Sequence, residues 1–226
     1  MEHSYKSRSL CLKVWGENAC FTRPEMKVER VSYDVMTPSA ARGVVEAILW
    51  KPSIRWIITR IDVLKSIQWE SVRRNEVGVV ISTDLAKTAM KNGTGKMGMY
   101  VEENRQQRAG LILKDVAYLI HAFFEVTTRA GPEDSVTKFE QIFLRRAEKG
   151  QCFHRPYLGC REFSAHFTPI TFGHTAPEPI AESGDLGWML HDLDFSGSEP
   201  TPRFFRARLS NGCLSVPPFN DCGVKA

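Results

Sequence analysis

Apolar residues recur with two different periods along the first 172 residues of the chain. From Thr37-Pro38 to Lys51-Pro52 they return every three or four positions, which predicts a helix with one buried face. The residues of that face are Ala41, Val44, Val45, Ile48 and Leu49. A second helix is predicted from Asp134-Ser135 to Lys149-Gly150, because capping residues stand at its start and a glycine stands past its end.

Four other segments show the β-branched content or the alternation that is typical of strands. They are Leu10–Trp15, which we expect Gly16 to end, Ile54–Leu64, Val116–Thr127 and a stretch within Tyr157–Phe167. With the two helices they give the order β-α-β-β-α-β, which is the ferredoxin-like arrangement shared by RNA-recognition domains. The sequence therefore predicts an α+β fold in which residues 1–172 form a ferredoxin-like domain.

Residues 66–114 interrupt this order between the second and third strands. They contain a short helical stretch, Asp84–Lys91, and many cations, which indicates an inserted, mobile basic hairpin. After residue 173 the chain is rich in turn-forming residues, and Asn211-Gly212 separates the predicted strands Phe204–Leu209 and Cys213–Val216. Because Asn-Gly accepts the positive φ of a tight turn, we predict a small C-terminal antiparallel β domain over residues 173–226.

The composition is that of a globular protein, since 42% of residues are hydrophobic and 25% are charged, which excludes a disordered or fibrous chain. No apolar run approaches the ~18 residues of a membrane span, and the N-terminus lacks the hydrophobic region of a secretory signal. We therefore expect a cytoplasmic protein with no membrane partner. The six cysteines never approach C-x-x-C spacing, so we expect reduced thiols and no metal site.

Charge is distributed unevenly along the chain. Through Glu162 there are 26 Lys and Arg against 19 Asp and Glu, a net charge of +7, whereas the remainder carries −3. A basic body favours a polyanionic partner such as a nucleic acid. Helical spacing places Lys138, Arg145 and Lys149 on one side of the second predicted helix, where they form either a solvated face or a stripe that grips phosphates.

The motifs of common enzyme classes are absent. No G-x-S-x-G or H-E-x-x-H occurs, and Gly93–Gly98, although it reads G-x-G-x-x-G, is not followed by the helix that a dinucleotide needs, so no cofactor is expected. Two histidines leave alternatives open. His121 is either a buried, hydrogen-bonded side chain or a group on an open sheet face beside Phe123, and His154 is either an exposed loop residue or a proton-transfer group.

Several segments resemble one known family. The run Phe21–Gly43, continued by Val44–Pro52, is similar to the N-terminal hallmark of the fifth CRISPR-associated protein family. The segments Ile67–Ser71, Leu113–Val116 and Tyr157–Phe163 resemble its Dvulg branch, which subtype I-C systems use. This resemblance implies a ferredoxin-like domain with a small C-terminal β domain. It also implies a metal-independent endoribonuclease that cuts precursor CRISPR RNA at the repeat hairpin and stays on the guide RNA in the interference complex.

The resemblance also implies a cleavage site, which this sequence departs from. The family's tyrosine, lysine and histidine fall at Leu49, Lys138 and Phe139, so only the lysine is kept. We therefore expect Lys138 to supply the cation and His121 or His154 to transfer protons. Because two of the three family residues are apolar, a second hypothesis is a non-catalytic subunit that holds the 5′ tag of the guide RNA.

The partners that the resemblance implies are the precursor repeat hairpin, the other subunits of the subtype I-C interference complex and, as a further possibility, duplex DNA. The cations that we expect to contact RNA are Arg42, Lys51, Arg73, Arg74, Arg145, Lys149, Arg155 and Arg161.

Overall fold

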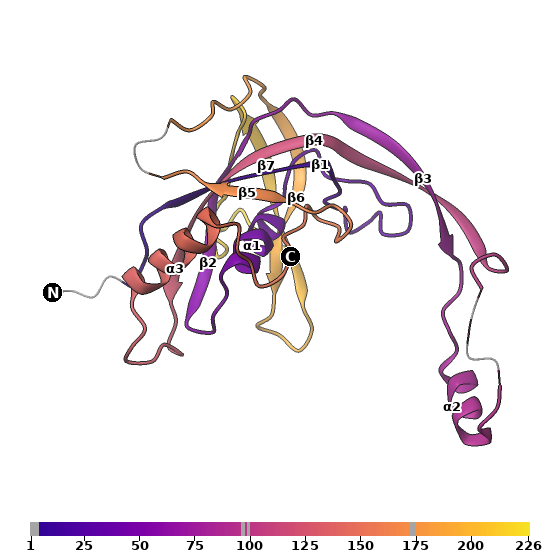
Figure 1. Cartoon of the computed structure of the whole chain (residues 1–226). Helices are drawn as coiled ribbons and strands as arrows, with labels where there is room; N and C mark the ends of the chain where they lie inside the picture. Colours follow the sequence, from indigo (N-terminus) through magenta and orange to yellow (C-terminus); the bar gives the residue numbers. More distant parts are fainter. Residues whose placement is uncertain (1–4, 96–97, 99, 172–174) are drawn as a thin grey trace.

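The computed structural model describes residues 5–95, 98, 100–171 and 175–226, and it shows an α+β chain built on an antiparallel sheet (Figure 1). The strands are β1 (Leu10–Ala19), β2 (Ile54–Val63), β3 (Trp69–Val77), β4 (Arg105–Val126), β5 (His166–Pro169), β6 (Gly184–Asp194), β7 (Thr201–Ser210) and β8 (Cys213–Ser215), and the helices are α1 (Pro38–Ile48), α2 (Thr83–Asn92) and α3 (Val136–Glu148). Neighbouring strands follow the order β5-β1-β4-β2-β8-β7-β6, and β3 pairs with the first half of β4.

The two predicted core helices are confirmed. The Thr37 hydroxyl accepts a hydrogen bond from the Ala40 N–H at the start of α1, and the Ser135 side chain accepts one from Lys138 N–H at the start of α3. All five apolar residues predicted for the buried face of α1 are buried, as are Phe139, Phe143 and Ala147 of α3. Both helices therefore form where their capping residues and apolar periodicity place them.

The helices α1 and α3 lie on the same side of β1, β4 and β5 (Figure 1). Successive side chains of a strand point to opposite faces, so Ile120, Ala122 and Phe124 of β4 share the face that the helices cover, and all three are buried. The Phe124 ring meets Phe139 of α3 edge-on, with 6.2 Å between the ring centroids. His121 and Phe123 consequently lie on the other face of the sheet.

Two glycines explain where the predicted strand boundaries differ from the structure. We expected Gly16 to end the first strand, but β1 continues to Ala19, and a side chain at Gly16 would come within 2.7 Å of Leu158 Cδ1, so close packing requires the glycine. The predicted strand within Tyr157–Phe167 was placed too early. Gly159 has φ +83°, and a side chain there would overlap the Cys20 carbonyl; the chain turns at this glycine, and β5 begins only at His166.

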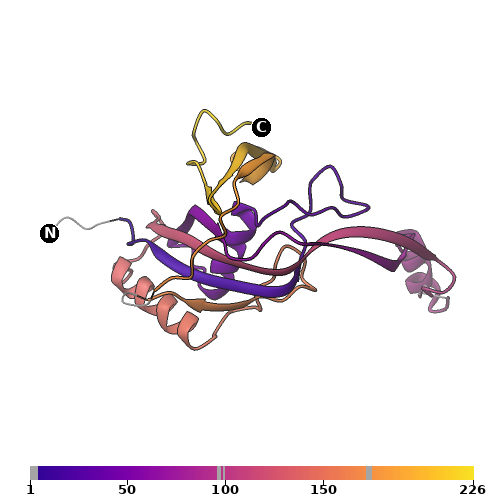
Figure 2. The same cartoon turned by 90° about the horizontal axis from the view of Figure 1, so that it is seen from above.

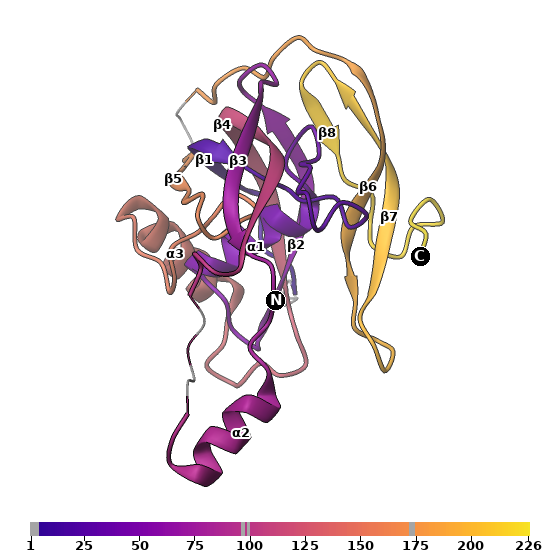
Figure 3. The ribbon, with the colours of Figure 1, turned by 90° about the vertical axis from the view of Figure 1, so that its right-hand side faces the viewer.

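The insertion forms a long two-stranded ribbon that carries α2 at its far end and projects from the body of the protein (Figures 1 and 3). Its helix matches the predicted Asp84–Lys91 within two residues. We expected the third core strand to start at Val116, but β4 starts at Arg105 because its first half pairs with β3. Part of the glycine-rich stretch Gly93–Gly98 lies outside the described residues.

The predicted C-terminal hairpin is confirmed, since β7 and β8 flank Asn211 (φ +46°) and Gly212 (φ +72°). The strands of this segment continue the main sheet, because β8 also pairs with β2. Viewed from above, β6 and β7 stand to one side of the helices and the long ribbon (Figure 2). Within the described residues, we find no helix with the length and apolarity that spanning a membrane requires.

Candidate nucleic-acid interface

The chain between α1 and β2 runs alongside α3. At one end the Arg146 guanidinium donates a hydrogen bond of 2.9 Å to the Ile48 carbonyl, and at the other the Ser53 hydroxyl donates one of 2.7 Å to Asp134. Arg146 lies in the last turn of α3 and Asp134 just before its first, so residues 48–53 span most of the helix. Trp50 and Lys51 therefore lie beside α3, and both are exposed.

The loop that follows α3 folds back to the same place. The Phe153 N–H donates a hydrogen bond of 2.8 Å to the Ala47 carbonyl, which holds the loop against the end of α1. The rings of Trp50 and Phe153 are 59% and 89% exposed, a large solvent exposure for two aromatic side chains on one part of the surface. Both stand among cations, which is the combination that binds the bases and phosphates of unpaired nucleic acid.

We call this surface the α3 strip. It consists of the exposed residues Trp50, Lys51, Lys138, Arg145, Lys149, Phe153, His154 and Arg155. At 1.5 Å per residue, Lys138 and Lys149 are separated by about 16 Å along the helix axis. Five of the eight residues are cations, and four of those cations were among the RNA contacts expected from the sequence. The fifth, Lys138, was expected at the cleavage site.

Lys138 points toward the beginning of its own helix. Its Nζ lies 3.3 Å from Asp134 Oδ1 and 3.1 Å from the Glu133 carbonyl oxygen. The hydrogen bond from the Ser53 hydroxyl, that from the Gly131 N–H and the Lys138 ammonium all lower the pKa of Asp134, so its carboxylate stays charged beside the lysine. An ammonium has three N–H donors, which leaves one for a phosphate.

Leu49 and Phe139, the two apolar residues that the resemblance aligns with the family's tyrosine and histidine, are both buried. Leu49 is fully buried, and its carbonyl accepts a hydrogen bond of 2.8 Å from the Trp56 indole N–H. Phe139 is 2% exposed and packs against Phe124. Neither side chain can reach an RNA bound at the surface, and neither can carry a proton.

His121 lies on the opposite face of the sheet from α3. Its Nε2 is 2.7 Å from Asp62 Oδ2 and 3.0 Å from Arg60 Nη2, and its side chain is 17% exposed. Burial raises the pKa of Asp62, but its contacts with His121, the hydrogen bond from Cys213 and the charge of Arg60 together lower the pKa below its usual value. His121 thus combines features of both alternatives that the sequence left open, since its side chain is hydrogen-bonded and mostly covered but lies with Phe123 on the sheet face opposite the helices.

The structure therefore does not bring the three expected catalytic residues together. Lys138 is directed toward the start of α3, His154 lies beyond its end, and His121 is separated from both by the sheet. One scissile phosphate cannot contact all three. Of the two histidines, His154 is the exposed one, and it lies next to Arg155 and near Tyr157, whose ring centroid is 6.5 Å from its own.

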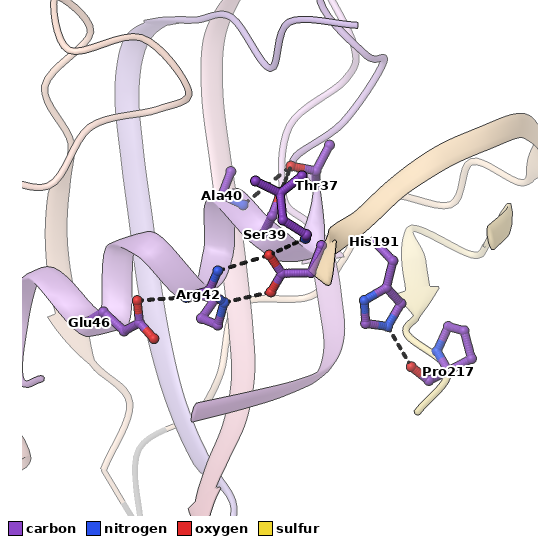
Figure 4. Close-up of polar contacts among 9 residues, drawn as sticks. Thr37, Ser39, Ala40, Arg42, Glu46, His191 and Pro217 are labelled. Atoms are coloured by element: carbon purple, nitrogen blue, oxygen red, sulfur yellow. Dashed lines mark hydrogen bonds and ion pairs between the residues drawn. The ribbon is translucent and has the colours of Figure 1, made fainter. Parts of the chain in front are cut away.

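The other expected RNA contacts are scattered. Arg42 binds both oxygens of Asp192 at 2.6 and 2.9 Å and also Glu46 at 2.8 Å, so its guanidinium joins α1 to β6 (Figure 4). Arg74 on the ribbon pairs with Glu162. Arg73 and Arg161 are exposed, but they lie on β3 and in the loop before β5, outside the α3 strip.

Sequence reasoning missed Trp50 and Phe153. Each had a signal, because Trp50 follows the last apolar residue of the α1 face directly and Phe153 is a lone aromatic residue in the polar loop Gly150–Arg155. All six cysteines are unpaired, as expected. Among the described residues, no three His, Cys, Asp or Glu side chains are grouped to hold a metal ion.

The buried position of Phe139 gives a first prediction. The substitution Phe139→His should lower the free energy of unfolding by about 3 kcal/mol or more, because it removes packing against Phe124 and buries a polar ring. Denaturant titration measures this change. The matched control is Phe153→His at an 89% exposed site, which should change the stability by about 0.5 kcal/mol or less. Equal stability of the two variants would contradict the packing described for α3.

Comparison with known proteins agrees with the resemblance seen in the sequence. Residues 9–217 match the Cas5d family, described as CRISPR-associated protein (Cas_Cas5). The chain is 54% identical over 213 residues to "CRISPR pre-crRNA endoribonuclease Cas5d" of Mannheimia succiniciproducens, covering 92% of this chain and 94% of that one. It is 43% identical over 230 aligned residues to the protein of the same name from Thermus thermophilus, covering 92% and 91% of the two chains.

A solved structure described as "Crystal Structure of CRISPR-associated Protein" superposes with a TM-score of 0.72 at 25% identity, and the match covers 99% of this chain and 100% of that one. The sequence match, which extends over nearly the whole chain, and the shared fold lead to one conclusion. The chain belongs to the Cas5d family of CRISPR-associated proteins.

Proposed function

We propose that this protein is an endoribonuclease that cuts precursor CRISPR RNA. The observation that carries the proposal is the 54% identity, over nearly all of both chains, to a relative named for that activity. Cutting at the repeat hairpin without a metal ion, and retention on the guide RNA with the other subunits of the subtype I-C complex, complete the proposal. Duplex DNA is a further proposed ligand, for which the exposed cations of the ribbon are available. The relatives come from bacteria, where RNA is made in the cytoplasm, and we place the protein there.

We infer that the body is a ferredoxin-like domain over residues 1–172, with the ribbon inserted at about 66–114. Support comes from the order β5-β1-β4-β2 of its antiparallel strands and from the two helices on one face of the sheet. Residues 173–226 are the proposed C-terminal β domain, whose hairpin of β7 and β8 is attached to the body through β2.

The α3 strip is the proposed RNA surface. Without a metal ion, the 2′-hydroxyl next to the scissile phosphate attacks the phosphorus, and the 5′-oxygen leaves. This needs a base for the hydroxyl proton, a cation for the charge that develops on the phosphate and an acid for the leaving oxygen. We propose His154 for proton transfer, since an imidazole can both accept and donate a proton, and its neighbour Arg155 for the developing charge.

Lys138 and His121, the other two residues expected at the cleavage site, are given other proposed roles. Lys138 is placed to bind a phosphate at the other end of the strip, where its third N–H is available. His121 would need RNA on the opposite face of the sheet, and its Nε2 is already bound to Asp62. The proposal therefore gives Lys138 a binding role and treats His121 as the alternative proton-transfer group.

The second candidate function is a non-catalytic subunit that holds the 5′ tag of the guide RNA. The specific observation in its favour is the burial of Leu49 and Phe139 at the positions of the family's tyrosine and histidine. The two functions are separated by incubating the pure protein with its own repeat RNA in EDTA. A single cut at one position supports the enzyme, whereas tight binding without a cut supports the second function.

Binding to the repeat hairpin should depend strongly on salt. Each phosphate that a cation neutralises adds roughly 0.7–0.9 to the slope of log K against log salt, and the α3 strip offers five cations. Titrations at several salt concentrations should therefore give a slope steeper than about −2, and Lys149→Ala should make it shallower by about 0.7. The control is Arg208→Ala, an exposed arginine on β7 outside the strip, which should leave the slope unchanged. An equal effect of both substitutions would show that the RNA lies elsewhere.

A further inference from the structure

Two aromatic rings stack on each other near the end of the α3 strip. Trp15 of β1 and His166 of β5 are directly paired across the two antiparallel strands. Their ring centroids are 5.6 Å apart and their planes differ by 21°, which is a stacked arrangement. Because each ring stands on a strand that is hydrogen-bonded to its neighbour, the pair is held in place before any ligand arrives.

Each ring of the stacked pair has a cation near it. Lys13 Nζ lies 5.4 Å from the centroid of the Trp15 ring. Arg155 Nη2 lies 3.4 Å from Nδ1 of the other ring, His166. His166 is exposed, while Trp15 is partly covered. The accessible ring of the stack is therefore the imidazole, and each of the two rings has a cation beside it.

We propose that the Trp15–His166 pair is a binding site for one unpaired base of the RNA, which extends the stack on the exposed face of His166. Every base has a flat π-face, and proteins hold single-stranded nucleotides by stacking them on aromatic rings, histidine included, next to cations that bind the neighbouring phosphates. Lys13 and Arg155 are in position to bind those phosphates. This inference rests on the proposed function, which makes RNA the ligand. It adds to the α3 strip a second RNA contact, on β1 and β5.

The site stands on the sheet face opposite α1 and α3, because Trp15 alternates with the buried Val14, and the Arg155–His166 contact at the edge strand β5 links it to the α3 strip. Arg155 belongs to the loop 150–157, whose Phe153 is held at the end of α1, and the same Arg155 contacts His166 of β5. An RNA that follows the cations of α3 past His154 reaches the Trp15–His166 pair by passing around the edge strand β5 at Arg155. A strand that leaves the base-paired part of the repeat can continue onto the pair, which assigns the site to the single-stranded flank of the hairpin.

The test compares two RNAs, the repeat hairpin alone and the hairpin with its single-stranded flank. For the flanked RNA, Trp15→Ala and His166→Ala should each weaken binding about tenfold, which is the size of one lost stacking contact. For the bare hairpin they should change the dissociation constant by less than about twofold. The matched control is Trp188→Ala on β6, an exposed indole with Lys225 Nζ 5.5 Å from its ring, which should affect neither RNA. His166→Ala changes an exposed side chain, so it keeps the test valid if Trp15→Ala folds poorly.

A fluorescent 2-aminopurine placed along the flank locates the stacked base directly. Its emission should fall on binding to the wild-type protein, as stacking quenches it, and should stay high with His166→Ala. The site is wrong if both variants bind the flanked RNA as the wild type does while cleavage of the repeat is intact. If the wild-type protein neither binds nor cuts its repeat RNA, the proposed function fails instead, and this site fails with it.

Discussion

Replacing the 2′-hydroxyl at the cut nucleotide with hydrogen should abolish cleavage of the repeat RNA, while the unmodified RNA should be cut at full rate in EDTA. In the proposed mechanism this hydroxyl is the attacking nucleophile, and no residue of the α3 strip can replace it. The expected loss in rate exceeds about 10⁴-fold. Activation of the hydroxyl by proton transfer alone contributes about 10²–10⁴-fold, and in the 2′-deoxy RNA the nucleophile itself is also missing. Single-turnover cleavage followed on a denaturing gel measures it.

The control is a 2′-deoxy substitution one nucleotide away, which leaves the attacking hydroxyl in place and should be cut normally. The products should carry a 5′-hydroxyl and a cyclic phosphate, since the 2′-oxygen ends bonded to the phosphorus. Cleavage that requires added Mg²⁺, or cleavage of the RNA that lacks the attacking hydroxyl, would contradict the mechanism. Neither result would bear on the proposed RNA-binding surface, which the salt dependence tests separately.

The parts of the fold that the sequence predicted are those that local physics determines. The starts of α1 and α3 follow from Thr37 and Ser135, whose side chains accept hydrogen bonds from backbone N–H groups three residues later. The tight turn between β7 and β8 follows from Asn211-Gly212, which tolerates positive φ. Each of these depends on at most a few consecutive residues, so a single sequence contains the information.

The predictions were wrong where a contact with a residue far away in the sequence determines the local structure. Gly16 reads as a strand end, yet it is kept small because Leu158 packs against it from a loop over 140 residues later. Val116 reads as a strand start, yet β4 begins at Arg105 because β3 pairs with its first half. Arg42 reads as an RNA contact, yet Asp192 of β6 binds it in two places. The periodicity of apolar residues predicts a helix or strand by itself, but it does not show which other element packs or pairs with it.

The same limit applies to the site. Helical spacing correctly grouped Lys138, Arg145 and Lys149 on the exposed side of α3. It did not reveal that residues 48–53 run along that helix, which the hydrogen bonds at Ile48 and Ser53 establish. Nor did it reveal that a histidine of β5 stacks on a tryptophan of β1, since the pairing depends on where β5 begins. Residue types were predictable, whereas their grouping required the fold.

The grouping leads to the second large effect, which separates the two ends of the α3 strip. His154→Ala should slow single-turnover cleavage by about 10²- to 10⁴-fold, the usual contribution of a positioned proton-transfer group, and should change RNA affinity only a few-fold. Lys138→Ala should slow cleavage by about fivefold or less, because its ammonium lies at the other end of the helix and is held by Asp134, so that only a surface phosphate contact is lost.

His154→Gln serves as the matched variant, because it keeps a polar side chain of similar reach but cannot transfer a proton at neutral pH. It should be as slow as His154→Ala, whereas a purely structural histidine would tolerate it. The RNA affinity is the second readout, and both His154 variants should bind within a few-fold of the wild type, since a proton-transfer group acts in the reaction and not in binding. If Lys138→Ala abolishes cleavage while both His154 variants cut normally, the reaction takes place at the start of α3. If His121→Ala abolishes it with the fold intact, the RNA is cut on the opposite face of the sheet. Either result would overturn the assignment of His154, and each would name the residue that replaces it.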